Sequence, residues 1–223
     1  MKIINTQDNF YIKENGYKKP KEMFKFIAKK ALKKNTLNKK ICDFGCATGD
    51  FLFYLNKIKP ENEYTGIDIK QNVLNKAKKY LPEVNFKRGS VLNKKIKKEN
   101  SFDLSFLIGV HPAFDSFEEC FSNLIYWTKP KGEIFICDLF NPDPVDVLVK
   151  YRLSKNYKIN SFEAGWNIFS HESIKNFLKK NKNVKSCSFE EFYMPFQLKR
   201  QKNPIRSWTM NMNKKKVMVN GLS

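Results

Sequence analysis

Residues 41–50, Ile-Cys-Asp-Phe-Gly-Cys-Ala-Thr-Gly-Asp, decide the fold class of this chain. An apolar run leads into a loop with two glycines, and an apolar segment with helical spacing follows from Phe51. A strand that enters a glycine-containing loop and then a helix is a frequent binding place for nucleotide-like ligands. Glycine suits this loop because the chain turns sharply there and a ligand must touch the backbone.

Strands and helices continue to alternate on the carboxyl side of this loop. Continuous apolar runs predict strands, and apolar residues three and four apart predict helices. A chain that alternates in this way forms an α/β, Rossmann-like, doubly wound and mostly parallel sheet. The predicted strands are 40–44, 64–69, 84–87, 102–110 and 132–139, and the predicted helices are 51–56, 73–80, 117–127 and 174–180.

Two segments flank this alternating core. Residues 1–39 predict an N-terminal arm and an amphipathic helix over 21–34, ahead of a single domain over 40–223. Within that domain, residues 140–170 predict a small substrate-binding insertion that includes a short helix at 145–151.

The end of the sheet is less clear from the sequence. Val184–Met194 predicts a sixth strand, and Arg206–Ser223 predicts a hairpin that turns at 213–216. Either this hairpin completes a seven-stranded sheet, or the last strand is missing and the exposed sheet edge invites dimerisation. A monomer and a homodimer both remain open.

Three acidic residues narrow the ligand of the glycine loop. Asp50 opens the helix that follows the loop, where a pyrophosphate would need room, so an NAD-dependent oxidoreductase is disfavoured. Asp68 ends the second strand about 20 residues beyond the glycines, where a carboxylate can hold both ribose hydroxyls. Asp43 and Asp68 together favour a phosphate-free adenosine donor such as S-adenosylmethionine, whose sulfonium is cationic.

Five segments in order resemble motifs of the class I S-adenosylmethionine-dependent methyltransferases. The resemblance is good over residues 40–140 and looser over the C-terminal third. It implies an enzyme that transfers a methyl group by in-line displacement and leaves S-adenosylhomocysteine as product. The five segments are 41–49, 64–68, 86–91, 102–104 and 127–134.

The same resemblance implies the donor site. Asp43 and the backbone of Gly45 would face the methionine part of the donor, Asp68 would hold the ribose, and Gly109 would lie beside the methyl group. Ala47 replaces a usual glycine, which is tolerable if its φ is negative, and Ser90 replaces an aspartate at the adenine amino group. The implied donor-binding residues are Asp43, Gly45, Cys46, Ala47, Gly49, Asp68, Ile69, Ser90, Val91 and Gly109.

The segment after the fourth strand bears on catalysis. His111 is the candidate general base, because histidine titrates near neutral pH and this position should face the methyl group. Alternatively, His111 hydrogen-bonds a loop carbonyl. Asp138 is a second polar candidate at the crevice or a cap for the turn at Asn141. His171, at the start of a predicted helix with Ser170 as its N-cap, is interpreted as structural.

Two classes of methyl acceptor follow from the rest of the sequence. The aromatic insertion suits a small polar acceptor, such as a sugar-linked or other biosynthetic intermediate, or else it packs against the sheet edge. The segment 108–114 lacks the Asn or Asp with which base-methylating enzymes orient an exocyclic amine. The insertion residues concerned are Tyr151, Arg152, Tyr157, Phe162 and Trp166.

The net charge of +20 keeps an RNA methyltransferase as the rival hypothesis, and a non-catalytic donor-binding protein is a third. The charge is almost entirely lysine and is scattered along the chain, which favours solvated faces over a nucleic-acid surface. The five cysteines form no CxxC pair, so we expect reduced thiols, a cytoplasmic protein and no metal site. We expect no membrane association, since no apolar run is long enough to span a bilayer.

Overall fold

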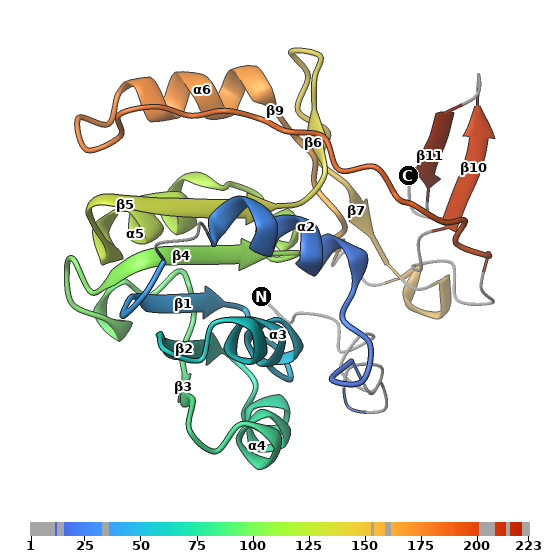
Figure 1. The fold of residues 1–223 in the computed structure, drawn as a ribbon. Helices are drawn as coiled ribbons and strands as arrows, with labels where there is room; N and C mark the ends of the chain where they lie inside the picture. Colours follow the sequence, from blue (N-terminus) through green and yellow to red (C-terminus); the bar gives the residue numbers. More distant parts are fainter. Residues whose placement is uncertain are drawn as a thin grey trace.

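The structure is a computed structural model that describes residues 12, 16–32, 36–152, 154–158, 162–200, 208–212 and 215–219. Its centre is a parallel sheet of five strands in the order β3-β2-β1-β4-β5 (Figure 1). The strand order reverses between β1 and β4, so their carboxyl ends flank the crevice where ligands bind in such sheets. The strands are β1 Lys40–Phe44, β2 Glu63–Asp68, β3 Asn85–Arg88, β4 Phe102–Ile108 and β5 Thr128–Cys137.

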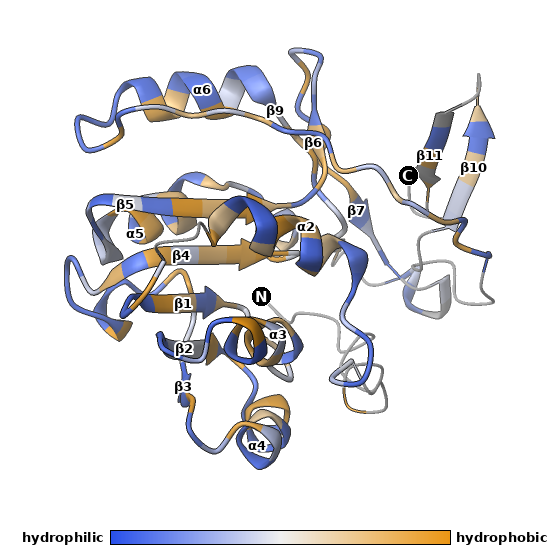
Figure 2. Ribbon diagram, viewed as in Figure 1, coloured by the Kyte–Doolittle hydropathy of each residue, from blue (hydrophilic) through white to orange (hydrophobic). Residues whose placement is uncertain are grey.

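Helices cover both faces of this sheet because the strands are apolar on both sides. On β1, Ile41 joins the core under α2, α3 and α4, whereas Cys42 and Phe44 join the core under α5 and α6. Apolar residues accordingly gather along β1, β4 and β5 (Figure 2). The helices are α2 Glu22–Ala31, α3 Asp50–Ile58, α4 Gln71–Tyr80, α5 Glu118–Trp127 and α6 His171–Lys179.

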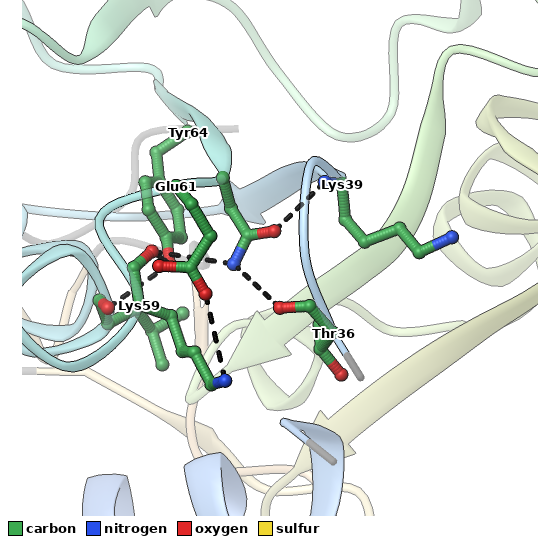
Figure 3. A network of polar contacts seen from close by, with 7 residues as sticks. Thr36, Lys39, Lys59, Glu61 and Tyr64 are labelled. Carbon is green, nitrogen blue, oxygen red and sulfur yellow. Dashed lines mark hydrogen bonds and ion pairs between the residues drawn. The ribbon is translucent and has the colours of Figure 1, made fainter. Parts of the chain in front are cut away.

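A polar network closes the amino edge of the sheet, beside the starts of β1 and β2 (Figure 3). The Lys39 N–H donates to Asn62 Oδ1 at 2.9 Å, and Asn62 Nδ2 donates to the Thr36 carbonyl oxygen at 3.3 Å. The Tyr64 hydroxyl donates to the Lys59 carbonyl oxygen at 2.8 Å. These bonds satisfy backbone groups where the chain leaves α3 and enters β2, and they join the segment before β1 to the turn before β2.

The predicted seven-stranded sheet is wrong in its strand number, because Val184–Met194 forms no strand. Aromatic side chains hold this segment instead of ladder hydrogen bonds. Phe189 stacks on His171 with ring centroids 3.8 Å apart, and Phe192 packs on Phe26 at 5.3 Å. The predicted C-terminal hairpin is confirmed as β10 Trp208–Met212 and β11 Lys215–Val219, but these strands form a separate antiparallel sheet.

Residues 140–170, here called the cap, lie outside the central sheet. The predicted helix at 145–151 is wrong, because Val147 pairs with Ile168 in a β-bridge. The Ser170 N-cap of α6 is confirmed, since its side chain accepts from the Ser173 N–H at 3.1 Å. The cap strands are β6 Phe140–Asn141 with β9 Phe169–Ser170, and β7 Lys150–Tyr151 with β8 Glu163–Ala164.

The predicted N-terminal amphipathic helix is confirmed as α2, which buries Phe24, Ile27, Ala28 and Ala31. Most of the predicted arm, residues 1–11 and 13–15, lies outside the described residues. No described helix has the length and apolar character that crossing a bilayer requires.

Candidate active site

The structure brings the predicted donor-binding residues to one place, the carboxyl edge of the sheet. Residues 43–44 end β1 and 45–49 form the loop after it, while Asp68 ends β2 and Ile69 comes next; residues 90–91 follow β3, and 109–111 follow β4. The β1 loop is tied to the neighbouring strand, because the Gly45 N–H donates to the Ile67 carbonyl oxygen at 2.7 Å. The loop therefore lies across the end of the sheet, next to the point where the strand order reverses.

The conformation of this loop explains its glycines. Gly45 has a φ of +77°, and a Cβ there would come within 2.3 Å of Val110 Cγ2. Gly49, with a φ of +79°, is the N-cap of α3. Ala47 has a φ of +47°, so the negative φ that would make alanine tolerable here is not adopted. Alanine is strained in this region because its Cβ crowds a backbone carbonyl.

Asp43 is a buried carboxylate with an unsatisfied oxygen. Its side chain is 3% exposed, and Oδ1 has no hydrogen-bond partner among the described residues. Burial raises the pKa of Asp43 well above its ordinary value, and the nearby Asp68 raises it further. A cationic ligand group beside Oδ1 would remove this penalty.

Asp68 already braces the loop. Its Oδ2 accepts from the Ala47 N–H and its Oδ1 accepts from the Lys70 N–H, both at 2.9 Å. Each carboxylate oxygen has a second lone pair, so the half-buried side chain can still accept from ribose hydroxyls. Ile69, next in the chain, is 37% exposed and offers an apolar surface at the same edge.

The segment after β3 is the expected adenine side of the site. Val91 is buried at 6% exposure, whereas Ser90 is half-buried. Ser90 Oγ accepts from the Leu92 N–H at 3.2 Å, so the hydroxyl shapes its own turn. One lone pair of the hydroxyl oxygen remains for a ligand amino group.

The end of β4 combines open space with a buried imidazole. Gly109 has a φ of +68°, and apart from Gly109 and its two chain neighbours no described residue has an atom within 4 Å of where its Cβ would stand. Two residues later, His111 is fully buried, and its ring stacks on Phe140 with centroids 5.0 Å apart at 14°.

His111 lies beside Asp138, which follows β5. His111 Nδ1 is 3.2 Å from Asp138 Oδ2, but the two atoms are not aligned for a hydrogen bond. Neither ring nitrogen bonds a loop carbonyl within the described part of the chain. Burial raises the pKa of Asp138, and the contact with His111 offsets only part of that effect. Asn141 closes its own turn, donating from Nδ2 to the Val145 carbonyl oxygen at 2.8 Å.

Asp50 stands at the first position of α3, where its side chain is 7% exposed and accepts from Thr48 Oγ1 at 3.2 Å. A buried carboxylate at a helix N-terminus opposes a phosphate, whereas the orphaned Asp43 oxygen suits a cation. These residues fit S-adenosylmethionine, which carries adenosine, a sulfonium and an ammonium but no phosphate. Among the described residues, no group of three or more His, Cys, Asp or Glu side chains could hold a metal ion.

The fold and this site define a Rossmann-like protein built to bind an adenosine-containing donor. A family model described as a methyltransferase domain matches residues 35–217, and the chain belongs to this family of class I, S-adenosylmethionine-dependent methyltransferases. Its methyl donor is therefore S-adenosylmethionine. A search of curated protein sequences finds no match.

Solved structures with the same fold are distant in sequence. The YcgJ protein from Bacillus subtilis has a TM-score of 0.58 and 14% identity, covering 78% of this chain and 73% of that one. The complex of the Haloferax volcanii Trm112 methyltransferase activator with a putative methyltransferase gives 0.58 and 14%, covering 80% and 76%. The PH0226 protein from Pyrococcus horikoshii gives 0.53 and 17%, covering 77% and 88%. At these identities, the likeness shows the fold alone.

Two residues next to the site escaped prediction from the sequence. Asn167 of the cap is fully buried and contacts the loop after β4, and Tyr17 packs against the β1 loop from the N-terminal side. Each acts through contacts that span more than 30 residues of chain. No local pattern marks such a contact, so only the fold reveals it.

Proposed function

We propose that this methyltransferase acts on a small polar molecule, such as a sugar-linked or other biosynthetic intermediate, held between the carboxyl edge and the cap. The observation that carries this proposal is the junction at Asn167. Its N–H donates to the Pro112 carbonyl oxygen at 3.0 Å, and its Nδ2 donates to the Phe114 carbonyl oxygen at 2.7 Å. Its Oδ1 accepts from the Val149 N–H at 2.8 Å.

This junction fixes the cap against the loop that follows β4. Lys150 of the cap adds an ion pair with Asp115 of the same loop. Both contacts lie within a few residues of Gly109 and His111, which border the donor site. A cap held there covers an acceptor of small size and restricts the approach of a folded macromolecule.

Two aromatic residues of the cap are exposed. Tyr157 is 62% exposed and Phe162 is 47% exposed, which supports a role in binding over one in packing. The Arg152 guanidinium lies over the Phe162 ring, 4.8 Å from its centroid. Exposed rings beside one arginine suit a polar acceptor that carries hydroxyl or acidic groups.

The proposed role of His111 is to receive the proton that a hydroxyl or amine acceptor loses. With Nδ1 facing Asp138, Nε2 is the nitrogen left for this task, and the carboxylate would stabilise the imidazolium that forms. Because the ring is fully buried, Phe140 and Phe169, which pack on it, must shift when the acceptor enters.

When bound, S-adenosylmethionine supplies an electrophilic methyl group. The chain positions the two reactants. In this proposal the β1 loop and Asp68 bind the donor, and the β4 loop and the cap bind the acceptor. Holding the two reactants at attack distance can provide most of the rate enhancement in a displacement of this kind. Exclusion of water by the cap strengthens the contact between His111 and Asp138.

The test supplies the protein with methyl-labelled S-adenosylmethionine and, separately, a small-molecule cell extract or total RNA. We expect label in the small-molecule fraction and little change in turnover between low and moderate salt. Label in RNA that falls steeply with salt would overturn the proposal in favour of an RNA methyltransferase.

The role of His111 has its own test. His111→Gln should leave S-adenosylhomocysteine binding intact and lower turnover about 100-fold or more, in the range of general base catalysis. His171→Gln, a change of the same kind on α6, serves as the control and should retain most activity. Equal turnover in His111→Gln and the wild type would remove His111 as the base.

A further inference from the structure

The segment before α2 lies against the outside of the β1 loop. Tyr17 is 8% exposed, and its hydroxyl donates to the Thr48 carbonyl oxygen. Its ring stacks on Tyr80 of α4, with centroids 4.3 Å apart at 27°, and meets Phe53 of α3 edge-on at 5.1 Å. Tyr17 therefore connects the donor loop to the two helices that follow it.

Gly16 approaches the same loop even more closely. A Cβ at Gly16 would lie 2.0 Å from Asp50 Oδ2, so any side chain there would displace one of the two partners. Asp50 Oδ1 in turn accepts from Thr48 Oγ1 at 3.2 Å. Tyr17 thus contacts Thr48, and Gly16 lies against Asp50, both on the outer side of the loop.

The loop needs outside support because one of its residues has a strained backbone. Ala47 has a φ of +47°, which is unfavourable for alanine, whereas Gly49, on the other side of Thr48, adopts +79° at little cost. From within, the Gly49 N–H donates to the Cys46 carbonyl oxygen at 2.8 Å, and Asp68 accepts from the Ala47 N–H at 2.9 Å. A strained loop of this kind persists only when its surroundings hold it.

We propose that Gly16 and Tyr17 form a clasp that holds residues 46–50 in the donor-binding conformation. They are positioning residues for the donor, and the inference rests on the donor site assigned above. A loop that is already held loses less conformational freedom when the ligand binds, so the clasp raises donor affinity. Burial, and then Asp50, raise the pKa of the Tyr17 phenol well above 10.0, so its hydroxyl remains a donor throughout the neutral range.

The test measures S-adenosylhomocysteine binding by calorimetry in Tyr17→Phe and Gly16→Ala. Tyr17→Phe keeps the stacked ring and removes one hydrogen bond to the loop, so we expect the Kd to rise about tenfold. Tyr80→Phe, the same chemical change in the stacking partner, is the matched control and should leave the Kd within about twofold. Amide hydrogen exchange at residues 46–50 should accelerate in Tyr17→Phe and not in the control.

A second pair of variants separates positioning from simple destabilisation. Asp50→Ala removes the atom that a Cβ at Gly16 would strike, so Gly16→Ala should weaken binding in the wild type and have little further effect in Asp50→Ala. A Kd for Tyr17→Phe equal to that of the wild type, or equal effects of Gly16→Ala in both backgrounds, would overturn the clasp. Failure of the wild type to bind S-adenosylhomocysteine would instead refute the donor site itself.

Discussion

The amino and carboxyl edges of the central sheet differ in whether their buried polar side chains have hydrogen-bond partners. At the amino edge, Asn62 is 7% exposed and its side chain bonds the backbone of Thr36 and Lys39. At the carboxyl edge lie all four buried side-chain atoms that lack a hydrogen-bond partner among the described residues. They are Asp43 Oδ1, His111 Nδ1, His111 Nε2 and Asp138 Oδ2.

The carboxylates at the two edges are perturbed in opposite directions. At the amino edge, burial alone would raise the pKa of Asp103, but the Lys40 N–H and the Lys129 ammonium, both 2.9 Å from Oδ2, hold it below 3.8. At the carboxyl edge, burial raises the pKa of Asp43 and Asp138. One edge is thus satisfied by the protein itself, and the other keeps groups that a ligand can satisfy.

The largest expected effect comes from removing a charge at the carboxyl edge. Asp68→Asn retains one acceptor for the loop and loses the charge that would bind the ribose hydroxyls. We expect the Kd for S-adenosylhomocysteine to rise about 100-fold, since hydrogen bonds to charged groups contribute roughly 1.5–3 kcal/mol each. Titration calorimetry measures this directly.

Asp103→Asn is the matched control, because it makes the same chemical change at the amino edge. It should lower stability and leave the donor Kd unchanged, as Asp103 contacts only Lys40 and Lys129 in the hydrogen bonds described. Equal losses of donor affinity in both variants would mean that the two edges are not functionally distinct.

A stability defect without a binding defect is expected at Asn62. Asn62→Ala leaves the Lys39 N–H and the Thr36 carbonyl oxygen without their side-chain partner at the amino edge. We expect the free energy of unfolding to fall by about 2–3 kcal/mol, given the cost of unsatisfied buried groups. Urea denaturation gives this value, and a donor Kd measured well below the midpoint should match that of the wild type.

The carboxyl edge was predictable from the sequence because its residues are set by strand ends. The last residues of parallel strands lie at one edge of the sheet, so the strand ends near Asp43 and Asp68 predicted neighbouring positions there. The place of Gly109 beside the methyl group was implied only by the resemblance to the methyltransferase family. Strand pairing at the far end of the sheet was not predictable in this way. Val184–Met194 has the composition of a strand, but its aromatic rings find partners on His171 and Phe26 instead.

Backbone conformation and tertiary contacts also lay beyond the sequence. An alanine does not itself indicate the positive φ that Ala47 adopts, and only the glycine usual at this position of the family pointed to it. The predicted helix at 145–151 is replaced by the pairing of Val147 with Ile168, and Asp146 accepts a hydrogen bond from Ser173 Oγ of α6 at 2.7 Å. Helix propensity is a weak determinant of structure, and contacts with residues distant in the sequence can override it.

A smaller effect, of the opposite sign, is expected at Asp43. Asp43→Asn removes a buried, uncompensated charge while keeping the shape of the side chain. The donor-free protein should gain on the order of 1 kcal/mol at pH 7, because the amide is less costly to bury unsatisfied than the carboxylate. The donor should bind less tightly, since the cation loses its partner.

The pH dependence of the stability gained in Asp43→Asn tests whether charge burial is its cause. The folded-state pKa of Asp43 is raised above the unfolded value near 3.8, so the wild-type protein is penalised as pH rises above that value. The stability advantage of Asp43→Asn should therefore vanish near pH 3.5 and grow toward neutral pH. A constant advantage across urea titrations from pH 4 to pH 8 would show that charge burial is not the cause.

The smallest effect concerns backbone strain in the donor loop. Ala47 has a φ of +47°, where a Cβ costs roughly 1–2 kcal/mol and glycine costs little. Ala47→Gly removes that strain, but it also gives the unfolded chain more freedom, which offsets about 0.4–1 kcal/mol. We expect a net stabilisation of about 0.5 kcal/mol in urea denaturation of the donor-free protein. Ala28→Gly, in the buried middle of α2, is the control and should destabilise, because its helical backbone gains nothing from glycine. Destabilisation by Ala47→Gly as large as that of the control would place Ala47 among the ordinary residues of the fold, and the contrast between the two edges would then rest on side chains alone.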